Sequence, residues 1–448
     1  MALKKKLGLA AVSAIVVGDM IGSGIFFTPG QLAAVAEADW QVYLIWAMCG
    51  FIALCGALTL AELAVLIPQA GVPYRALSEA YGSFAGFMQA WVMVLVSGPG
   101  AIAGIAILFG EFADRIFGAG DAPLAWAVGA IVFFAAVNLR GVSWGGRTQI
   151  LLTGVKVLGL LALIVGGILV ADAAPVTAGG SVTTGGLPGF FQFVGLGVAI
   201  VLFTYDGWID ASNIAGEVRN PGATFPRALG FGVVVITVLY LLVNVAFLRV
   251  VPLEAMRADP EGVAATVAIA AFGSVGGMLL NLLMWISIFG ALGGLVMTLP
   301  RLFYAAANDY LDAASGTPAA PLFRGMATLS ATRGVPAGAI LFAALVSIAA
   351  LVFFGSFSRI VSFFVVPFQL MNVLLIASIY RLRPRLSGPG DYRAPLYPWL
   401  PAIFIAVMLV FIVSAFVFNP LDALIGVVLT LAGAPVYLAL TRRARGNA

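Results

Sequence analysis

Two short segments of this sequence place polar groups and glycines where a membrane-spanning helix should be apolar. Gly22-Ser23-Gly24 interrupts a long apolar stretch over residues 9–36. Thr204-Tyr205-Asp206-Gly207-Trp208 interrupts a second apolar stretch, over residues 190–216. Unpaired backbone groups are costly inside a bilayer, so irregular backbone is expected only where it lines a cavity or contacts a ligand. Two interrupted spans of this kind predict a substrate site near the middle of a membrane.

The chemistry at the first interruption is that of two helix ends. Gly22 and Gly24 allow the backbone to leave helical geometry, and a helix that restarts at Ile25 has N–H groups without partners. These N–H groups and the positive end of the helix dipole favour a carboxylate. The carbonyl groups of Met20 and Ile21 are expected to accept from an ammonium group. A zwitterion fits this pair of ends, whereas the alternative is a kinked helix whose glycines only allow close packing.

The second interruption adds a carboxylate and aromatic side chains. Gly207 is its flexible point, and Phe203 could close over a ligand or offer its carbonyl oxygen to an ammonium group. Three roles are open for Asp206: holding the unwound segment through backbone N–H groups, pairing with a cationic ligand, or exchanging protons. The first of these is favoured, because an Asp beside a break readily caps the next helical turn.

A single lysine, Lys156, lies in the middle of an apolar span. A buried ammonium group needs oxygen atoms around it. Candidate partners are the carbonyl groups of Gly18 and Ile21 and the side chains of Asp19 and Ser287. A cation built into the protein would fill a place that Na⁺ could otherwise take, so sodium coupling is not expected. The alternatives are proton coupling through a lysine that can lose its proton, and a lysine that only faces an inner vestibule.

The rest of the chain supplies the helices that must position these residues. The 448 residues are 62% hydrophobic and only 9% charged, which predicts an all-α polytopic membrane protein with a single transmembrane domain over residues 1–448. Apolar blocks between turn and charge signals predict twelve spans. These cover residues 9–36, 42–67, 83–113, 123–139, 148–170, 190–216, 228–248, 276–306, 336–354, 359–380, 397–418 and 421–440.

The charge distribution predicts the orientation of these spans. Of the 23 lysines and arginines, 18 fall in segments on one side of the predicted membrane and four on the other. This bias predicts a multi-pass protein of the cell (inner or plasma) membrane, with both termini in the cytoplasm. Because topology explains the basic excess, no nucleic-acid partner is expected.

Several kinds of chemistry are excluded by composition. The chain contains no histidine, and its two cysteines, Cys49 and Cys55, lie in one apolar span. Neither a metal site nor a cofactor is expected. There is also no set of residues suited to nucleophilic catalysis, so the protein is not expected to be an enzyme.

Four motifs together resemble the amino acid-polyamine-organocation (APC) superfamily. They are Gly22 to Phe26, Phe203 to Trp208, Glu217 to Pro221, and Thr298 to Tyr304. More narrowly, the chain is similar to prokaryotic L-amino acid transporter (LAT)-type amino acid permeases, over residues 8–440. The resemblance implies a LeuT-type fold with broken helices 1 and 6. In this fold, residues 8–170 and 190–383 form two inverted 5+5 repeats, and helices 11 and 12, over residues 397–440, are peripheral.

The resemblance also implies which residues form the site. By that resemblance, Ile21, Ser23 and Gly24 with Phe203 and Asp206 hold the two ends of the amino acid. With neighbouring residues, the predicted substrate-binding set is Ile21, Gly22, Ser23, Gly24, Ile25, Phe203, Thr204, Asp206, Gly207 and Ala291. Lys156 and Ser287 match the positions where sodium-independent members replace the sodium of their coupled relatives, and with Gly18 and Asp19, the expected neighbours of Lys156, they form the predicted coupling set with its built-in cation. The implied partners are a small-molecule L-amino acid and membrane lipid. Related heteromeric transporters carry a cysteine in the loop after the third span, and residues 114–122 contain none, so no disulfide-linked heavy chain is expected.

The function that these observations favour is secondary active transport of neutral L-amino acids by alternating access. Sodium independence and exchange of one amino acid for another are expected. Three alternatives stay open. The protein could be a proton-coupled symporter, a transporter of cationic amino acids or polyamines with Asp206 or Asp210 as counter-charge, or a nutrient sensor that does not transport.

Overall fold

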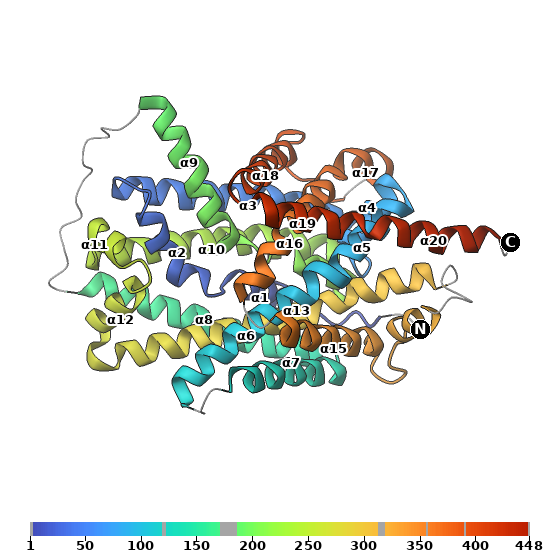
Figure 1. Ribbon diagram of the computed structural model, residues 1–448, viewed down its shortest axis with the longest axis horizontal. Coiled ribbons are helices and arrows are strands. Elements are labelled where there is room, and N and C mark those ends of the chain that lie inside the picture. The colour runs from blue at the N-terminus through green and yellow to red at the C-terminus, as the bar shows by residue number, and fades with distance from the viewer. Residues whose placement is uncertain are drawn as a thin grey trace.

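The chain folds as a bundle of long helices. The computed structural model describes residues 3–118, 122–170, 186–311, 319–354, 357–388 and 391–446. Within these ranges the chain forms no strand, and its extended pairing is limited to one isolated parallel bridge between Leu7 and Val218. Most of the long helices run along the longest axis of the molecule (Figure 1). Eleven segments of the described part are long and apolar enough to cross a membrane.

The membrane-spanning segments are built from single helices or from helices joined across a break. They comprise α1 (Leu9–Met20) with α2 (Gly24–Ala33), α3 (Asp39–Leu66), α5 (Ser83–Trp91) with α6 (Gly98–Phe117), α7 (Pro123–Arg140), α8 (Val142–Leu169), α9 (Gly186–Leu202) with the 3₁₀ segments that follow it up to Glu217, α10 (Pro221–Val250), α12 (Val263–Phe272) with α13 (Gly276–Tyr310), α16 (Phe357–Ala377) with α17 (Ile379–Leu386), α18 (Trp399–Phe418), and α19 (Pro420–Leu431) with α20 (Gly433–Gly446).

The ninth of the twelve predicted spans, over residues 336–354, coincides with α15 (Ala337–Phe354). Over Ala337–Phe353 it is a shorter apolar helix than the other eleven segments. Three further short helices lie between the spans: α4 (Val72–Tyr81), α11 (Leu253–Ala258) and α14 (Ala320–Met326). The helical class is thus as predicted, and the described part of the chain has eleven candidate spans and one shorter apolar helix.

The stretch over residues 249–275, predicted to be a loop, is largely helical. It contains α11 and α12, and α12 packs against α8 and α13. The sequence Val263–Phe272 is apolar but too short to be recognised as a span, and packing against two long helices stabilises it. Of the residues between the spans predicted over residues 148–170 and 190–216, those over residues 171–185 lie outside the described part of the chain.

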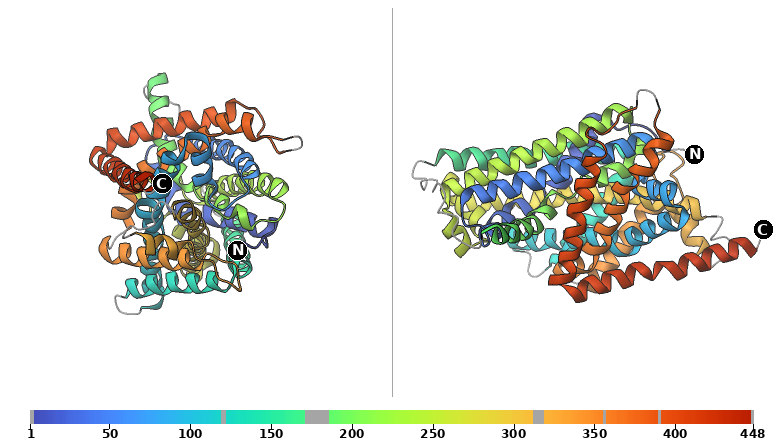
Figure 2. Two further views of the ribbon diagram at one scale, coloured as in Figure 1. Left: turned by 90° about the vertical axis from the view of Figure 1, so that its right-hand side faces the viewer. Right: turned by 90° about the horizontal axis from the view of Figure 1, so that it is seen from above.

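The first helix lies at the centre of the bundle. α1 packs against α8, α10 and α13, and α10 in turn packs against α3. α18 and α19 lie at the periphery (Figure 2), where many of their large apolar side chains are exposed, such as Leu421 at 69%. This arrangement buries the interruption that follows α1 and leaves apolar surface on the outside of the bundle, as a lipid environment requires.

Candidate functional site

The first interruption is a three-residue break between two helices. α1 ends at Met20 and α2 begins at Gly24. The backbone N–H groups of Ser23, Gly24 and Ile25 have no acceptor among the described residues, and Ser23 provides no side-chain cap. These are the unpaired donors expected at a helix amino terminus. They give this end of the break the character of an anion site.

The carbonyl groups at the end of α1 already accept hydrogen bonds from the protein. The hydroxyl group of Tyr240 in α10 donates to Met20 O at 2.7 Å. The ammonium group of Lys156 donates to Gly18 O at 2.6 Å and to Ile21 O at 2.9 Å. The two carbonyls that the sequence offers to a ligand, those of Met20 and Ile21, are therefore tied to neighbouring helices in this structure.

Lys156 is fully buried in α8 and reaches the carboxyl end of α1. A cation is favoured there because the helix dipole is negative at that end. The neighbouring turns of α8 add polar contacts of the same kind, since Thr153 donates to Ala14 O at 2.7 Å and Gln149 donates to Gly290 O at 3.1 Å. The polar face of α8 thereby fixes the end of α1 in place. Ser287, predicted as a further partner of Lys156, is buried with no hydrogen bond to its hydroxyl oxygen among the described residues.

The second interruption is longer and has a different geometry. After α9 the chain forms a 3₁₀ turn over Phe203–Tyr205, and it continues after Ile209 as a 3₁₀ segment over Asp210–Glu217. Gly207 has φ +117°, which a side-chain-bearing residue rarely adopts. The Asp206 carboxylate accepts a hydrogen bond from Gln369 Nε2 at 3.1 Å. The favoured expectation for Asp206, capping of backbone N–H groups, is not seen in the described part of the chain, where its partner is this side chain of α16.

The two interruptions touch each other directly. A Cβ atom at Gly207 would lie 2.7 Å from the carbonyl carbon of Asp19, and one at Gly24 would lie 2.9 Å from Thr204 Oγ1. The hydroxyl groups of Thr28 and Thr204 are 3.0 Å apart. Glycine is required at both contact points because a side chain has no space there. The breaks are thus fixed relative to one another by backbone contact.

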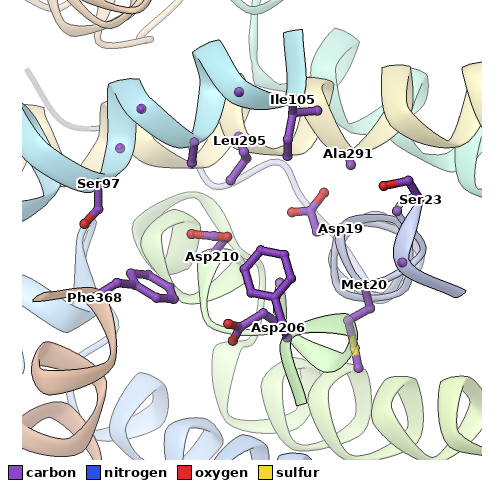
Figure 3. A pocket seen from close by; sticks show the side chains of 18 of the residues that line it. Asp19, Met20, Ser23, Ser97, Ile105, Asp206, Asp210, Ala291, Leu295 and Phe368 are labelled. Carbon is purple, nitrogen blue, oxygen red and sulfur yellow. The ribbon is translucent and has the colours of Figure 1, made fainter. Parts of the chain in front are cut away.

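A cavity of about 170 Å³ lies beside the two breaks (Figure 3). Nine of the predicted residues line it: Asp19, Gly22, Ser23, Gly24, Phe203, Thr204, Asp206, Gly207 and Ala291. Five others do not line it: Gly18, Ile21, Ile25, Lys156 and Ser287. Within the second group, Lys156 donates to the carbonyl oxygens of Gly18 and Ile21.

One wall of the cavity was not predicted from the sequence. The segment from α5 to α6 contains a π-helical turn over Val92–Ser97, and residues from Met93 to Leu108 line the cavity. Ser97-Gly98-Pro99-Gly100 in the predicted span over residues 83–113 was the available signal, since π-turns are frequent at functional sites. Phe368 of α16 also lines the cavity and carried no signal in the sequence.

Three carboxylates surround the cavity. Asp19, Asp206 and Asp210 all line it, and Figure 3 shows their side chains around the same space. Asp206 has Gln369 as a partner, whereas both carboxylate oxygens of Asp19 are buried without a hydrogen bond among the described residues. Lys156 and Asp19 form no ion pair there either, contrary to the expectation that they are partners. No group of three or more acidic or cysteine side chains in the described part is arranged to hold a metal ion.

A buried ion pair connects α13 with the end of the segment that follows the second break. Arg301 Nε of α13 lies 2.8 Å from Glu217 Oε2, and both side chains are fully buried. Glu217 O accepts from the backbone N–H groups of Lys6 and Leu7 at 2.9 and 3.0 Å. The segment before α1 thus pairs with the segment after the second break. Phe203, which lines the cavity, is 44% exposed, so the cavity can be approached past this side chain.

Comparison with known proteins agrees with this geometry. A family model described as amino acid permease matches residues 7–440. The chain belongs to this family. It is an APC-superfamily, LAT-type amino acid permease, as the motifs indicated, and the family consists of transporters.

The curated relatives align over nearly the whole of this permease. The serine/threonine exchanger SteT of Bacillus subtilis (strain 168) is 31% identical, over 98% of this chain and 98% of its own length. The b(0,+)-type amino acid transporter 1 of Mus musculus is 29% identical, over 93% of this chain and 84% of its own length. The cystine/glutamate transporter of Homo sapiens is 28% identical, over 97% of this chain and 85% of its own length.

Proposed function

We propose that this permease is a sodium-independent exchanger of neutral L-amino acids that works by alternating access. The observation that carries the proposal is the cavity at the contact between two helix breaks, which has unpaired N–H groups at one edge and carboxylates at another. An amino acid has the complementary pair of charges on one carbon atom. The family membership supports the substrate class.

The two charged groups of the amino acid find different partners in this cavity. Its carboxylate is placed at the N–H groups of Ser23, Gly24 and Ile25, where the amino terminus of α2 favours an anion. Its ammonium group faces Asp206, whose other neighbour is the amide of Gln369. The side chain then lies against the apolar wall that Ile105, Ala291 and Leu295 contribute. Such a wall suits a neutral side chain.

The position of Lys156 supports sodium independence. Its ammonium group already occupies the space between the carbonyl oxygens of Gly18 and Ile21, and it supplies there the charge that a sodium ion would supply. Bringing Na⁺ next to a buried ammonium would add a second positive charge at the same carbonyl groups. We therefore assign Lys156, with Gly18, as the built-in cation site, and Ser287 and Asp19 as its neighbours.

The architecture of the proposal is the LeuT-type arrangement. α15 completes a set of twelve spans, residues 8–170 and 190–383 form the inverted repeats, and helices 11 and 12, over residues 397–440, are peripheral. From the excess of basic residues on one side of the spans we infer that both termini lie in the cytoplasm, and we assign the ion pair of Arg301 and Glu217 to the cytoplasmic side as a seal. Exchange is favoured because SteT is a serine/threonine exchanger and the cavity here resembles a site for one small zwitterion.

Transport assays in proteoliposomes test this function. At equal pH on both sides of the membrane, we expect uptake of radiolabelled L-serine, L-alanine or L-leucine only when the vesicles contain amino acid, and equal rates with sodium or potassium outside. Vesicles loaded with buffer alone, and protein-free vesicles, are the controls. Sodium-stimulated uptake, or saturable binding with no flux in loaded vesicles, would contradict the proposal.

A second candidate function is transport of cationic amino acids or polyamines. The observation that favours it is the presence of Asp206 and Asp210 in the lining of one small cavity. Competition separates the candidates: excess L-lysine, L-arginine or putrescine should leave uptake of labelled L-serine nearly unchanged if the substrates are neutral. Strong inhibition by these cations, with weak inhibition by L-leucine, would favour the second candidate.

A further inference from the structure

Asp19 has an environment that disfavours a carboxylate. Both of its side-chain oxygens are buried, and no donor among the described residues reaches them. It lies in the last turn of α1, where the helix dipole is negative and repels an anion. A Cβ atom at Gly294 of α13 would lie 1.7 Å from Asp19 Oδ1. The side chain therefore occupies a niche that only a glycine leaves open, yet it has no partner there.

The charged groups around Asp19 do not neutralise it. Lys156 of α8 is the nearby cation, but its ammonium group points to the carbonyl oxygens of Gly18 and Ile21. The segment after the second break contributes two more carboxylates to the cavity, Asp206 and Asp210. From α10, Tyr240 donates to the backbone at Met20, and α13 contributes glycines at this level, namely Gly290 and Gly294.

Counting these groups leaves two negative charges unmatched if all of them are ionised, because three carboxylates face one ammonium group. A zwitterionic amino acid brings no net charge, so substrate binding does not change this balance. Unmatched buried charge is costly inside a membrane. All three carboxylates line the cavity, and Asp206 is hydrogen-bonded to Gln369, whereas neither oxygen of Asp19 has a hydrogen-bond donor among the described residues.

We infer that Asp19 is a proton-binding site and that this permease can couple net amino acid uptake to proton entry. The inference rests on the proposed function and adds a proton as a second substrate. In the conformation described here, Asp19 holds a proton taken from the side on which Phe203 is exposed. Opening of the seal between Arg301 and Glu217 admits water to the end of α1, and the acid then releases its proton to that side. The substrate-free protein, with Asp19 ionised, then returns to the conformation described here, and Asp19 takes up the next proton.

The test compares exchange with net uptake in the same proteoliposomes. Wild-type protein should take up L-serine into vesicles without internal amino acid when the outside is acidic, and a pH-sensitive dye inside should report proton entry with the substrate. In Asp19→Asn we expect gradient-driven uptake and substrate-linked proton entry to fall at least tenfold. Exchange against internal L-serine should fall less than this and should lose its dependence on pH. Asp19→Ser is a second variant without an acid group, in case Asn impairs folding.

The outcomes separate this inference from the proposed function. If wild-type protein exchanges L-serine but no proton enters with it, the inference is wrong and the proposed function stands. If Asp19→Asn or Asp19→Ser carries protons as the wild type does, another group binds the proton and the inference is also wrong. If L-lysine or putrescine is transported without proton entry, the substrate itself matches the negative charge. If loaded vesicles show no exchange at all, the proposed function has failed.

Discussion

The two helix breaks differ in length, in charge and in what holds them. The first spans only residues 21–23, is followed by a regular α-helix, and has its carbonyl groups tied to Lys156 and Tyr240 of other helices. The second runs through 3₁₀ segments and carries the carboxylates of Asp206 and Asp210. One break therefore presents N–H groups and the other presents anionic groups to the same cavity.

This difference explains how the two interruptions together can orient a ligand that carries both a carboxylate and an ammonium group. The cation that neutralises the end of α1 comes from α8, so the first break can offer its N–H groups to an anion without competition from its own carbonyl groups. The second break has no such cation among the described residues and keeps its negative character. The difference between the breaks can be tested by changing each of them in turn.

Replacement of Lys156 should have the largest effect, because it removes the feature that distinguishes the first break. Lys156→Ala leaves two buried carbonyl groups without a donor, at about 1–3 kcal/mol each, and we expect transport to fall about 100-fold. Uptake in loaded proteoliposomes measures this. Size-exclusion chromatography in detergent checks that the variant is folded, and Lys4→Ala, near the amino terminus, is the matched control. Wild-type rates in Lys156→Ala would show that the built-in cation is dispensable.

Substitution of Gly207 should have the next largest effect, because it forces the two breaks apart. Alanine at this position has a strained backbone and its Cβ would meet the backbone of Asp19 at 2.7 Å. We expect the transport rate to fall about 30-fold, since strain and displacement of the backbone destabilise the site by roughly 2 kcal/mol. Gly154→Ala is the matched control, because a Cβ atom there meets nothing within 4 Å. Equal rates for both variants would mean that contact between the breaks does not matter for transport.

Removal of one charge from the second break should weaken substrate binding more than it slows turnover, so KM should change more than kcat. Asp206→Asn keeps the shape of the side chain and an acceptor for Gln369, but it removes the negative charge that faces the ammonium group of the substrate. We expect KM to rise about tenfold, in line with about 1.5 kcal/mol for a charged hydrogen bond, and kcat to change less. Asp422→Asn in α19, which does not line this cavity, should leave KM unchanged. A fall in kcat at constant KM would argue that Asp206 acts in the conformational change.

The smallest effect is expected for Tyr240. Tyr240→Phe removes the hydroxyl group that donates to Met20 O at 2.7 Å but keeps the ring, which packs against Trp46 with centroids 5.3 Å apart. One hydrogen bond of about 1 kcal/mol corresponds to a loss of about fivefold. Initial rates of exchange are sufficient to measure this. A loss as large as that of Lys156→Ala would mean that the carbonyl of Met20 is as important as those of Gly18 and Ile21.

Several features of the site could be predicted from the sequence because they are local exceptions in apolar segments. The glycines at 22, 24 and 207 and the lone Lys156 stand out against spans of apolar residues, and backbone physics connects such exceptions with a cavity. The family indicated by the four motifs is confirmed. The hydrogen bonds of Lys156 to Gly18 and Ile21 are present in the structure, and its role in coupling stays a prediction.

Other features could not be predicted because apolar helices do not reveal which face meets which neighbour. Helices in a membrane are apolar on all sides, so periodicity does not show that Gln369 reaches Asp206 or that Met93 and Ser97 line the cavity. For the same reason α12 was not recognised, since its stability comes from packing against α8 and α13.

The sequence by itself determined that this chain is a helical membrane protein with two broken spans and one buried cation, because glycine and lysine at these positions have consequences that do not depend on neighbours. Only the tertiary structure decided which charged groups have partners. It directs Lys156 to the carbonyl groups of α1 and leaves Asp19 without a donor. Electrostatic pairing depends on distances of a few ångströms between helices that are remote in the sequence, and such distances exist only after the bundle has packed.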